Sequence, residues 1–303
     1  MDEGLTITFI SVAMFIGSFL LGFIPLLFKL SVKSLQFVSI LGAGLLCGTA
    51  LAITIPEGVG LLEDSWRESS DSPLAPNASE ESASSSDGSS PPRFYVSIAL
   101  TFGFTFMFVV DQIGGYFSKQ DRTTQMSNNA HITATMGLVI HAAADGFALG
   151  AAVATGQVTV QVIVFFAVIL HKAPAAFGLV SFLMHAGLEK KYIQGHLLAF
   201  SAAAPVVAIS TYFILHATGK SSEDQLIATG VGMLFSAGTF LYVATVHVLP
   251  EVSYSRIEEP ISNSQEHNDV VTHQTRHLGL LESLTLILGV GLPVVLALGL
   301  HDD

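Results

Sequence analysis

Eight long apolar stretches restrict this chain to one kind of fold. They cover residues 5–28, 35–61, 94–117, 132–154, 159–184, 197–216, 226–250 and 279–300. A helix needs about 20 predominantly apolar residues to cross the hydrocarbon core of a bilayer, and each stretch is long enough to do so. Because hydrocarbon offers backbone polar groups no partners, such spans must close their hydrogen bonds within a helix. We therefore expect an all-α integral membrane protein with eight transmembrane helices, forming a single transmembrane domain over residues 1–303.

The composition agrees with a membrane protein. Hydrophobic residues make up 50% of the chain and charged residues 12%, whereas soluble domains carry about 25% charged residues. The net charge of −12 argues against a nucleic-acid partner. The single cysteine, Cys47, excludes an intrachain disulfide. No basic residue precedes the first stretch, so we expect it to be retained as a span and not cleaved as a signal peptide.

The basic residues of the loops predict how the spans are oriented. Eight spans place both termini on one side of the membrane. The loops on that side hold three basic residues, Arg67, Arg93 and Lys220. The opposite loops hold eight, namely Lys29, Lys33, Lys119, Arg122, Lys190, Lys191, Arg256 and Arg276. Because cytoplasmic loops are enriched in Lys and Arg, we expect both termini to be extracellular or lumenal.

Two long polar segments lie between the spans. Residues 63–93 are rich in Ser, Pro and acidic residues and cannot bury a core, so we expect a disordered lumenal or extracellular loop. The sequon Asn77-Ala78-Ser79 within it predicts glycosylation of Asn77. Residues 251–278 are expected to form a polar cytoplasmic loop. Its histidines either bind metal weakly or are simply solvated; they are His267, His273 and His277.

A segment of the second stretch is echoed in the seventh. The segment "GLLCGTALAITIPE" ends at Glu57, and "GTFLYVATVHVLPE" ends at Glu251. Matching offsets hold Gly44 and Gly238, Ala50 and Ala244, and Pro56 and Pro250. Since the two stretches cross the membrane in opposite directions, this pattern is expected of an inverted repeat, which is common in secondary transporters. Chance similarity between two helices rich in small residues is the alternative.

Ionisable residues inside the apolar stretches predict a functional site. His141 and Asp145 in the fourth stretch are four residues apart, so they share one helix face. His171 lies within the fifth stretch. Imidazole and carboxylate groups are ligands of a divalent transition ion such as Zn²⁺, so we expect these three residues to converge near the bilayer midplane as a metal site. The alternative is that they are hydrogen-bonded packing residues.

Lys172 and Pro174 follow His171 and are expected to modulate this site. A lysine at the centre of a span costs about 2.5–3.5 kcal/mol, and a buried ammonium needs an anion. Asp145 is the expected partner of Lys172 when the site is empty, and the lysine charge is expected to restrict the site to a single metal ion. Pro174 lacks an N–H and is expected to kink the helix beside His171.

Three further residues are candidate path residues for a metal ion. His247 and Glu251 repeat the four-residue spacing at the predicted cytoplasmic end of the seventh stretch. Glu57 lies at the predicted lumenal end of the second stretch. We interpret them either as way-stations at the entrance and exit of a metal path or as ordinary polar residues of helix ends.

At these residues the chain resembles the Zrt/Irt-like protein (ZIP) family of divalent metal transporters. The matching pieces are "HAAADG", "HKAPAAFG", "GLLCGTALAITIPEG" and "FSAGTFLYVATVHVLPE". The resemblance implies a 3+2+3 arrangement of the eight helices, in which an inverted repeat flanks helices four and five. It also implies movement of zinc into the cytosol, often by a homodimer, with no enzymatic turnover and no cofactor. The segment "LVSFLMHAGLE" resembles the branch found in the Golgi (trans-Golgi network) and at the plasma membrane.

The chain departs from the family pattern at four positions. Ala142 stands where the family commonly has Asn, while Lys172, Ala175 and Ala176 replace an acid, a histidine and a second acid. The family ligands therefore carry over only onto His141, Asp145 and His171. This departure favours a mononuclear site over the binuclear site of other members.

Two other functions stay open on the sequence alone. Relatives of this branch have been linked to binding of a steroid hormone (androgen) and to G-protein signalling, so the first is a membrane receptor with the ZIP fold. The second is an intramembrane zinc hydrolase, in which the metal activates water. The same ligands accept Cd²⁺ and Fe²⁺ as well as Zn²⁺, so the residues do not choose the metal.

Overall fold

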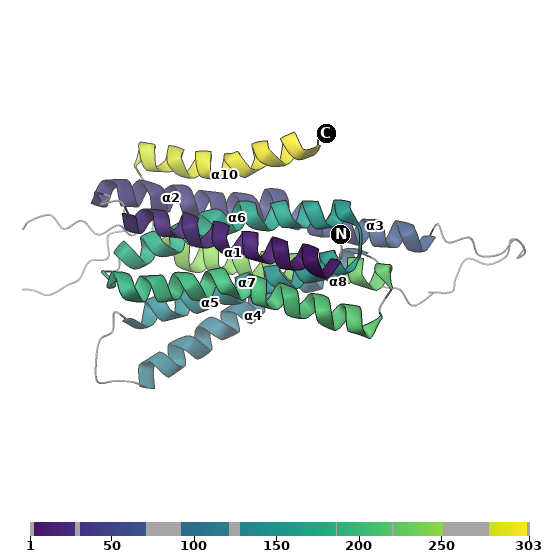
Figure 1. Cartoon of the computed structure of the whole chain (residues 1–303). Helices are drawn as coiled ribbons and strands as arrows, with labels where there is room; N and C mark the ends of the chain where they lie inside the picture. Colours follow the sequence, from purple (N-terminus) through teal and green to yellow (C-terminus); the bar gives the residue numbers. More distant parts are fainter. Residues whose placement is uncertain are drawn as a thin grey trace, which may run out of the picture.

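The computed structural model describes residues 3–27, 31–70, 92–120, 128–185, 187–219, 221–250 and 279–301. Every regular element in these ranges is helical (Figure 1). The α-helices are α1 (Glu3–Leu27), α2 (Val32–Thr49), α3 (Ile55–Ser70), α4 (Pro92–Gln120), α5 (Asn128–Ala154), α6 (Val158–His185), α7 (Lys190–Thr218), α8 (Ser222–Tyr242) and α10 (Leu280–His301). Two π-helical turns interrupt this pattern: η1 (Ala50–Thr54) joins α2 to α3, and η2 (Val243–Val248) follows α8. The predicted all-α fold is confirmed.

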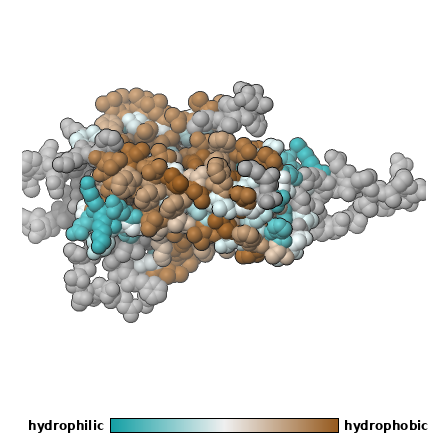
Figure 2. Space-filling model, viewed as in Figure 1, coloured by the Kyte–Doolittle hydropathy of each residue, from teal (hydrophilic) through white to brown (hydrophobic). Residues whose placement is uncertain are grey.

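The helices have the length and the surface of membrane spans. Seven described helical stretches are long and apolar enough to cross a bilayer, and α10 adds a shorter apolar stretch, Leu280–Val295. On the face that Figure 2 shows, apolar residues cover the middle of the bundle and hydrophilic residues gather at its two ends. The start of α1 and the end of α10 lie at the same end of the bundle (Figure 1), as an even number of passes requires. The prediction of a multi-pass membrane protein is therefore confirmed.

The first polar loop begins later than expected. Helix α3 continues to Ser70, so residues 63–70 are helical and do not belong to the loop. Ser65 is fully buried, which shows that this extension of α3 still packs against the bundle. Residues 71–91 and 251–278 lie outside the described residues. The predictions for Asn77, Glu251, His267, His273 and His277 fall on them.

The two segments of the sequence echo share a local backbone irregularity. In both, the α-helix widens into a π-helical turn shortly before the proline. The N–H of Ile55 bonds to the carbonyl of Ala50, five residues earlier. In the same way the N–H of Leu249 bonds to the carbonyl of Ala244. Proline removes the N–H that the carbonyl four residues earlier would accept, and a π turn shifts the hydrogen-bond register around that gap.

Close helix pairs hold the bundle together. Helix α2 packs against α10, α4 against α8, and α5 against α7. A Cβ at Gly44 in α2 would overlap the carbonyl oxygen of Leu286 in α10. Likewise, a Cβ at Gly238 in α8 would overlap the carbonyl oxygen of Leu100 in α4. These two glycines are a matched pair of the echo, and small residues at such positions let helix backbones approach closely within a bilayer.

Helices α5 and α8 form the interior of the bundle, and α6, with 44% of its apolar window buried, packs against α5. In the apolar windows of α5 and α8, 72% of the residues are buried, compared with 17% in α4. Helix α5 contacts α6, α7 and α8, and α6 also contacts α1 and α2. Polar groups on the inner helices are therefore shielded from lipid, and the candidate site lies among them.

Gly103 on α4 provides a test of this packing. A Cβ at Gly103 would overlap the carbonyl oxygen of Phe235 in α8, whereas a Cβ at Gly115 on the same helix meets no atom within 4 Å. We expect Gly103→Ala to destabilise the protein by about 1–3 kcal/mol, as overpacking does. The control, Gly115→Ala, should leave stability unchanged or raise it by up to about 1 kcal/mol through helix propensity. Thermal unfolding in detergent measures the difference, and equal melting temperatures would contradict a close α4–α8 contact.

Candidate metal centre

The three predicted ligands meet in the interior of the bundle. His141 and Asp145 lie on α5, and His171 lies on α6. One ligand atom from each residue lies within 4.8 Å of the other two, and all three side chains are buried. Within the described ranges, no other group of three His, Cys, Asp or Glu side chains is close enough to share a metal ion. The structure thus shows the convergence that the spacing predicts.

The distances between the ligand atoms suit a small divalent cation. Asp145 Oδ2 accepts a hydrogen bond from His171 Nε2 at 2.9 Å and lies 3.3 Å from His141 Nε2. Bonds of about 2.0–2.1 Å in a tetrahedral zinc site place ligand atoms about 3.3 Å apart. Among the described residues, His141 Nε2 and His171 Nδ1 find no hydrogen-bond partner, although both are buried. Buried polar atoms normally have a hydrogen-bond partner. A cation bound to Asp145 would be a partner for the lone pair of His141 Nε2.

Helix α8 adds two residues that the sequence analysis missed. Ser236 Oγ donates a hydrogen bond to Asp145 Oδ1 and lies 3.0 Å from His141 Nδ1. Thr239 Oγ1 lies 3.3 Å from the same nitrogen. Both hydroxyl side chains are fully buried. Their trace in the sequence is two hydroxyl residues three positions apart in an apolar helix, and such residues are too common in membrane helices to be singled out.

An aromatic ring covers one side of the cluster. The ring of Phe240 in α8 stacks on His141, with centroids 4.2 Å apart, and its centroid lies 5.5 Å from that of His171. The two imidazole centroids are themselves 5.4 Å apart. This apolar wall keeps water away from part of the cluster, which lowers the local dielectric and strengthens interactions between charges there.

Lys172 is buried, but it does not pair with Asp145. Its Nζ donates to the backbone carbonyl of Phe200 in α7 at 3.4 Å and lies 4.4 Å from the centre of the Phe200 ring. No salt bridge joins Lys172 to a carboxylate in the described part of the chain. The predicted direct pair is therefore wrong. The oxygens of Asp145 already face two imidazoles and a hydroxyl, while a carbonyl and an aromatic face surround the ammonium.

The structure bears only in part on the remaining predicted residues. Pro174 lies inside α6, which continues on both sides of it, so the kink stays a prediction. Glu57 is half-buried in the first turn of α3 and does not belong to the cluster. His247 lies in η2, and Glu251 falls outside the described residues. Their role as path residues also stays a prediction.

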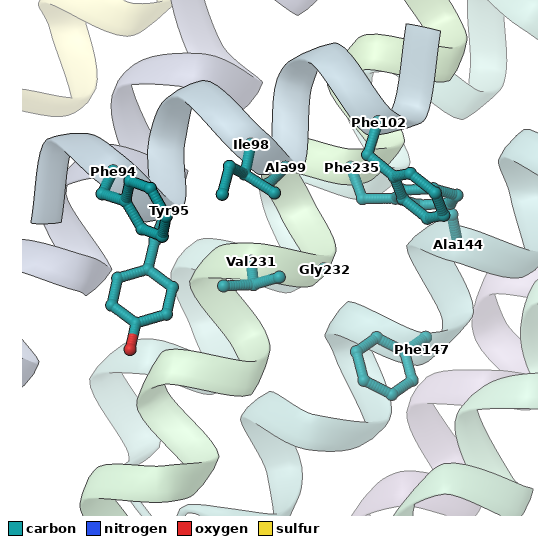
Figure 3. A pocket seen from close by; sticks show the side chains of 10 residues that line it. All are labelled: Phe94, Tyr95, Ile98, Ala99, Phe102, Ala144, Phe147, Val231, Gly232 and Phe235. Carbon is teal, nitrogen blue, oxygen red and sulfur yellow. The ribbon is translucent and has the colours of Figure 1, made fainter. Parts of the chain in front are cut away.

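Half of the residues that line one apolar pocket come from α4. It has a volume of about 490 Å³ and lies between α4, α5 and α8, where Figure 3 shows the side chains that line it. Tyr95 carries the single polar side-chain group among the ten lining residues. Two other lining residues, Ala144 and Phe235, directly precede Asp145 and Ser236 in the chain. The pocket offers a bare cation almost no ligands, so it is distinct from the candidate metal centre.

Known proteins resemble this chain over most of its length. The profile of the family described as ZIP Zinc transporter matches residues 118–297. Zinc transporter ZIP9 of Xenopus tropicalis is 47% identical over 309 residues, which cover 99% of each chain. Zinc transporter ZIP9 of Micropogonias undulatus is 45% identical over 317 residues, which cover 99% of this chain and 100% of that protein. Zinc transporter ZIP4 of Homo sapiens is 32% identical over 126 residues, or 42% of this chain and 18% of that protein.

The fold and the cluster define a multi-pass membrane protein whose interior holds three side chains that could together bind a metal ion. The family profile matches more than half of the chain, and relatives at 45–47% identity align with nearly all of it. The chain belongs to the ZIP family of zinc transporters. The family resemblance of the sequence motifs is thereby confirmed.

Substitution of single ligands tests the metal centre. We expect Asp145→Ala and His141→Ala to bind Zn²⁺ at least about tenfold more weakly than wild type. Even the removal of a group that only hydrogen-bonds to a metal ligand lowers metal affinity by about tenfold or more. His216→Ala is the matched control, since it removes an imidazole of α7 outside the cluster and should bind like wild type. Isothermal titration calorimetry on the purified protein measures the affinities. Unchanged binding by Asp145→Ala would place the metal elsewhere.

Proposed function

We propose that the chain moves Zn²⁺ from the extracellular space or an organelle lumen into the cytosol by alternating access around His141, Asp145 and His171. One observation carries this proposal: a buried His/Asp cluster, spaced for a small divalent cation, lies on the inner helices of a ZIP-family membrane protein. Relatives that align over the whole chain are named zinc transporters. A cluster buried inside the bundle must open to each side of the membrane in turn to take up and release its cation.

The helix arrangement that we propose is 3+2+3. One repeat holds α1, α2–α3 and α4, the other holds α7, α8 and α10, and α5 and α6 lie between them. In this arrangement α1 corresponds to α7, α2–α3 to α8, α4 to α10, and α5 to α6. The contact between α2 and α10 then corresponds to the contact between α8 and α4. In the same way, the contacts of α6 with α1 and α2 correspond to those of α5 with α7 and α8. The matched π turns η1 and η2 support the same correspondence. The cluster then lies on the central pair, where transporters with inverted repeats bind their substrates.

The direction and compartment that we propose rest on the sequence. By the predicted spans, eight basic residues lie in loops on one side of the membrane and three on the other, which supports termini outside the cytosol. The Golgi and the plasma membrane are the proposed locations by resemblance to the family branch. Glycosylation of Asn77 in the first loop agrees with this orientation, and a homodimer is the proposed assembly.

Lys172 is proposed to limit the cluster to one cation. It directly follows His171 in the chain, and its ammonium is held in the interior by Phe200. Two unit charges about 4 Å apart interact by about 4 kcal/mol at an effective dielectric constant of 20. A second divalent cation beside the first would meet this repulsion at a position where other family members supply a carboxylate.

Zinc entry into proteoliposomes that contain a trapped fluorescent indicator tests the proposed function. Wild type is expected to show saturable entry. Asp145→Ala and His171→Ala should lower the rate at least about tenfold, because each removes one of the three ligands. His216→Ala, outside the cluster, should transport like wild type.

Other outcomes of this assay point to other functions. No entry through folded wild type would remove transport, and ligand-dependent signalling with a steroid and a G protein would then support the receptor. Zinc-dependent proteolysis without entry would support the hydrolase. Entry that survives both substitutions would place the site elsewhere, with His247 and Glu251 as the next residues to change. Competition by Cd²⁺ or Fe²⁺ reports which cations the site accepts.

Substitution of Lys172 tests the limit of one cation. Lys172→Glu is expected to raise the number of bound Zn²⁺ ions from one to two per chain, because it removes the repelling charge and adds a ligand. Lys172→Met removes the charge without adding a ligand and should stay at one. Equilibrium dialysis followed by metal analysis gives the stoichiometry. One ion per chain in Lys172→Glu would show that the lysine does not set the limit.

A further inference from the structure

The two carboxylate oxygens of Asp145 have different partners. Oδ2 faces the two imidazoles, 2.9 Å from His171 Nε2 and 3.3 Å from His141 Nε2. Oδ1 accepts a hydrogen bond from Ser236 Oγ on α8. All of these side chains are buried, so little water competes for either oxygen. Oδ2 is therefore hydrogen-bonded to His171, a candidate ligand that a bound cation would share with it, whereas Oδ1 is held by Ser236, which is not one of the three candidate ligands.

Ser236 also orients His141. Its hydroxyl has a single proton, which it donates to Asp145, so toward His141 Nδ1 at 3.0 Å it is an acceptor. The backbone carbonyl of Ser236 lies 3.2 Å from the same nitrogen. Nδ1 therefore carries the ring proton, and Nε2 presents its lone pair beside Asp145 Oδ2. One residue of α8 thus orients two of the three ligands on α5 and α6.

The position of Ser236 is held by its surroundings. Ser236 lies inside α8 (Ser222–Tyr242), so the helix fixes its backbone. The preceding residue, Phe235, packs its backbone against Gly103 of α4 so closely that a Cβ there would overlap it. The hydroxyl therefore cannot easily follow a carboxylate that rotates. If Asp145 is to offer both oxygens to one cation, its bond to Ser236 must break.

We infer that Ser236 is a specificity-determining residue, which makes the cluster favour small four-coordinate cations over larger ones. This inference rests on the proposed function. Zn²⁺ takes carboxylate oxygens at about 2.0–2.2 Å, almost always with four ligands where its site is structural. Larger cations take more oxygen ligands at longer distances and use bidentate carboxylates, as Ca²⁺ does. By holding Oδ1, Ser236 keeps Asp145 monodentate and so favours Zn²⁺ over Cd²⁺, a larger ion of the same charge.

Ser236→Ala tests this inference, because it frees Oδ1 of Asp145. We expect the affinity for Zn²⁺ to fall about tenfold and the affinity for Cd²⁺ to stay constant or rise. The ratio of the two dissociation constants then shifts at least about tenfold toward Cd²⁺. Calorimetric titration of the purified full chain with each metal alone measures both constants. Ser236→Thr keeps a hydroxyl and should restore the wild-type ratio.

Two control variants separate selectivity from general damage. Ser181→Ala removes a fully buried hydroxyl that has no hydrogen-bond partner among the described residues, so both affinities should stay at their wild-type values. Thr239→Val removes a hydroxyl that contacts His141 but makes no hydrogen bond to Asp145. It should weaken the binding of both metals alike and leave their ratio unchanged.

The outcomes distinguish this inference from the proposed function. If wild type binds neither metal, the proposed function fails and the inference fails with it. If wild type binds Zn²⁺ and Ser236→Ala weakens both metals equally, the inference fails and the proposed function stands. Infrared difference spectra of zinc-loaded wild type give a second test, which does not depend on whether the Ser236 variants fold. A wide separation of the carboxylate bands, assigned with Asp145→Asn, indicates binding through one oxygen, and a narrow separation would overturn the inference.

Discussion

A carboxylate inside the membrane is the constraint on which the rest of this structure depends. An ionised aspartate at the centre of a span costs about 2.5–3.5 kcal/mol on insertion scales, so Asp145 needs partners around it. Helix α8 supplies a hydroxyl, and α5 and α6 supply imidazoles. These three helices must therefore lie close together, and the alanines and glycine of "HAAADG" occupy little of the space between them. The need of Asp145 for polar partners therefore accounts both for the close packing of these helices and for the candidate metal centre.

Lys172 gives the interior a second charge, of opposite sign. Because a carbonyl and the ring of Phe200 stabilise it, it leaves Asp145 accessible to a cation. The formal charges of the two residues cancel before a cation arrives. A divalent ion then adds positive charge that the single carboxylate cannot balance. This excess of positive charge limits how strongly the cluster can hold a divalent cation.

Sequence reasoning succeeds here where a residue leaves a periodic or compositional trace. The spans follow from apolar length, and the pairing of His141 with Asp145 follows from the helical period. Ser236 and Thr239 leave no such trace, because their hydroxyls acquire a role only when α8 packs against α5. The partner of Lys172 was predicted wrongly, since the choice between a carboxylate and a backbone carbonyl depends on distances that spacing does not contain. The end of α3 was also placed too early, because hydropathy marks where a helix leaves the apolar layer and not where its winding ends.

Each π turn also rotates the helix that follows it relative to the helix that precedes it. One residue corresponds to about 100° around an α-helix, and a π turn holds one residue more than the α-turn that it replaces. The segment after η2 is therefore rotated by about 100° from its place in an uninterrupted helix. Ser236, Thr239 and Phe240 all precede η2, so the helix face that they present to the cluster ends there. Loss of one residue from η2 would rotate the end of the helix and spare the cluster, whereas loss of one residue just before Ser236 would turn its hydroxyl away from Asp145.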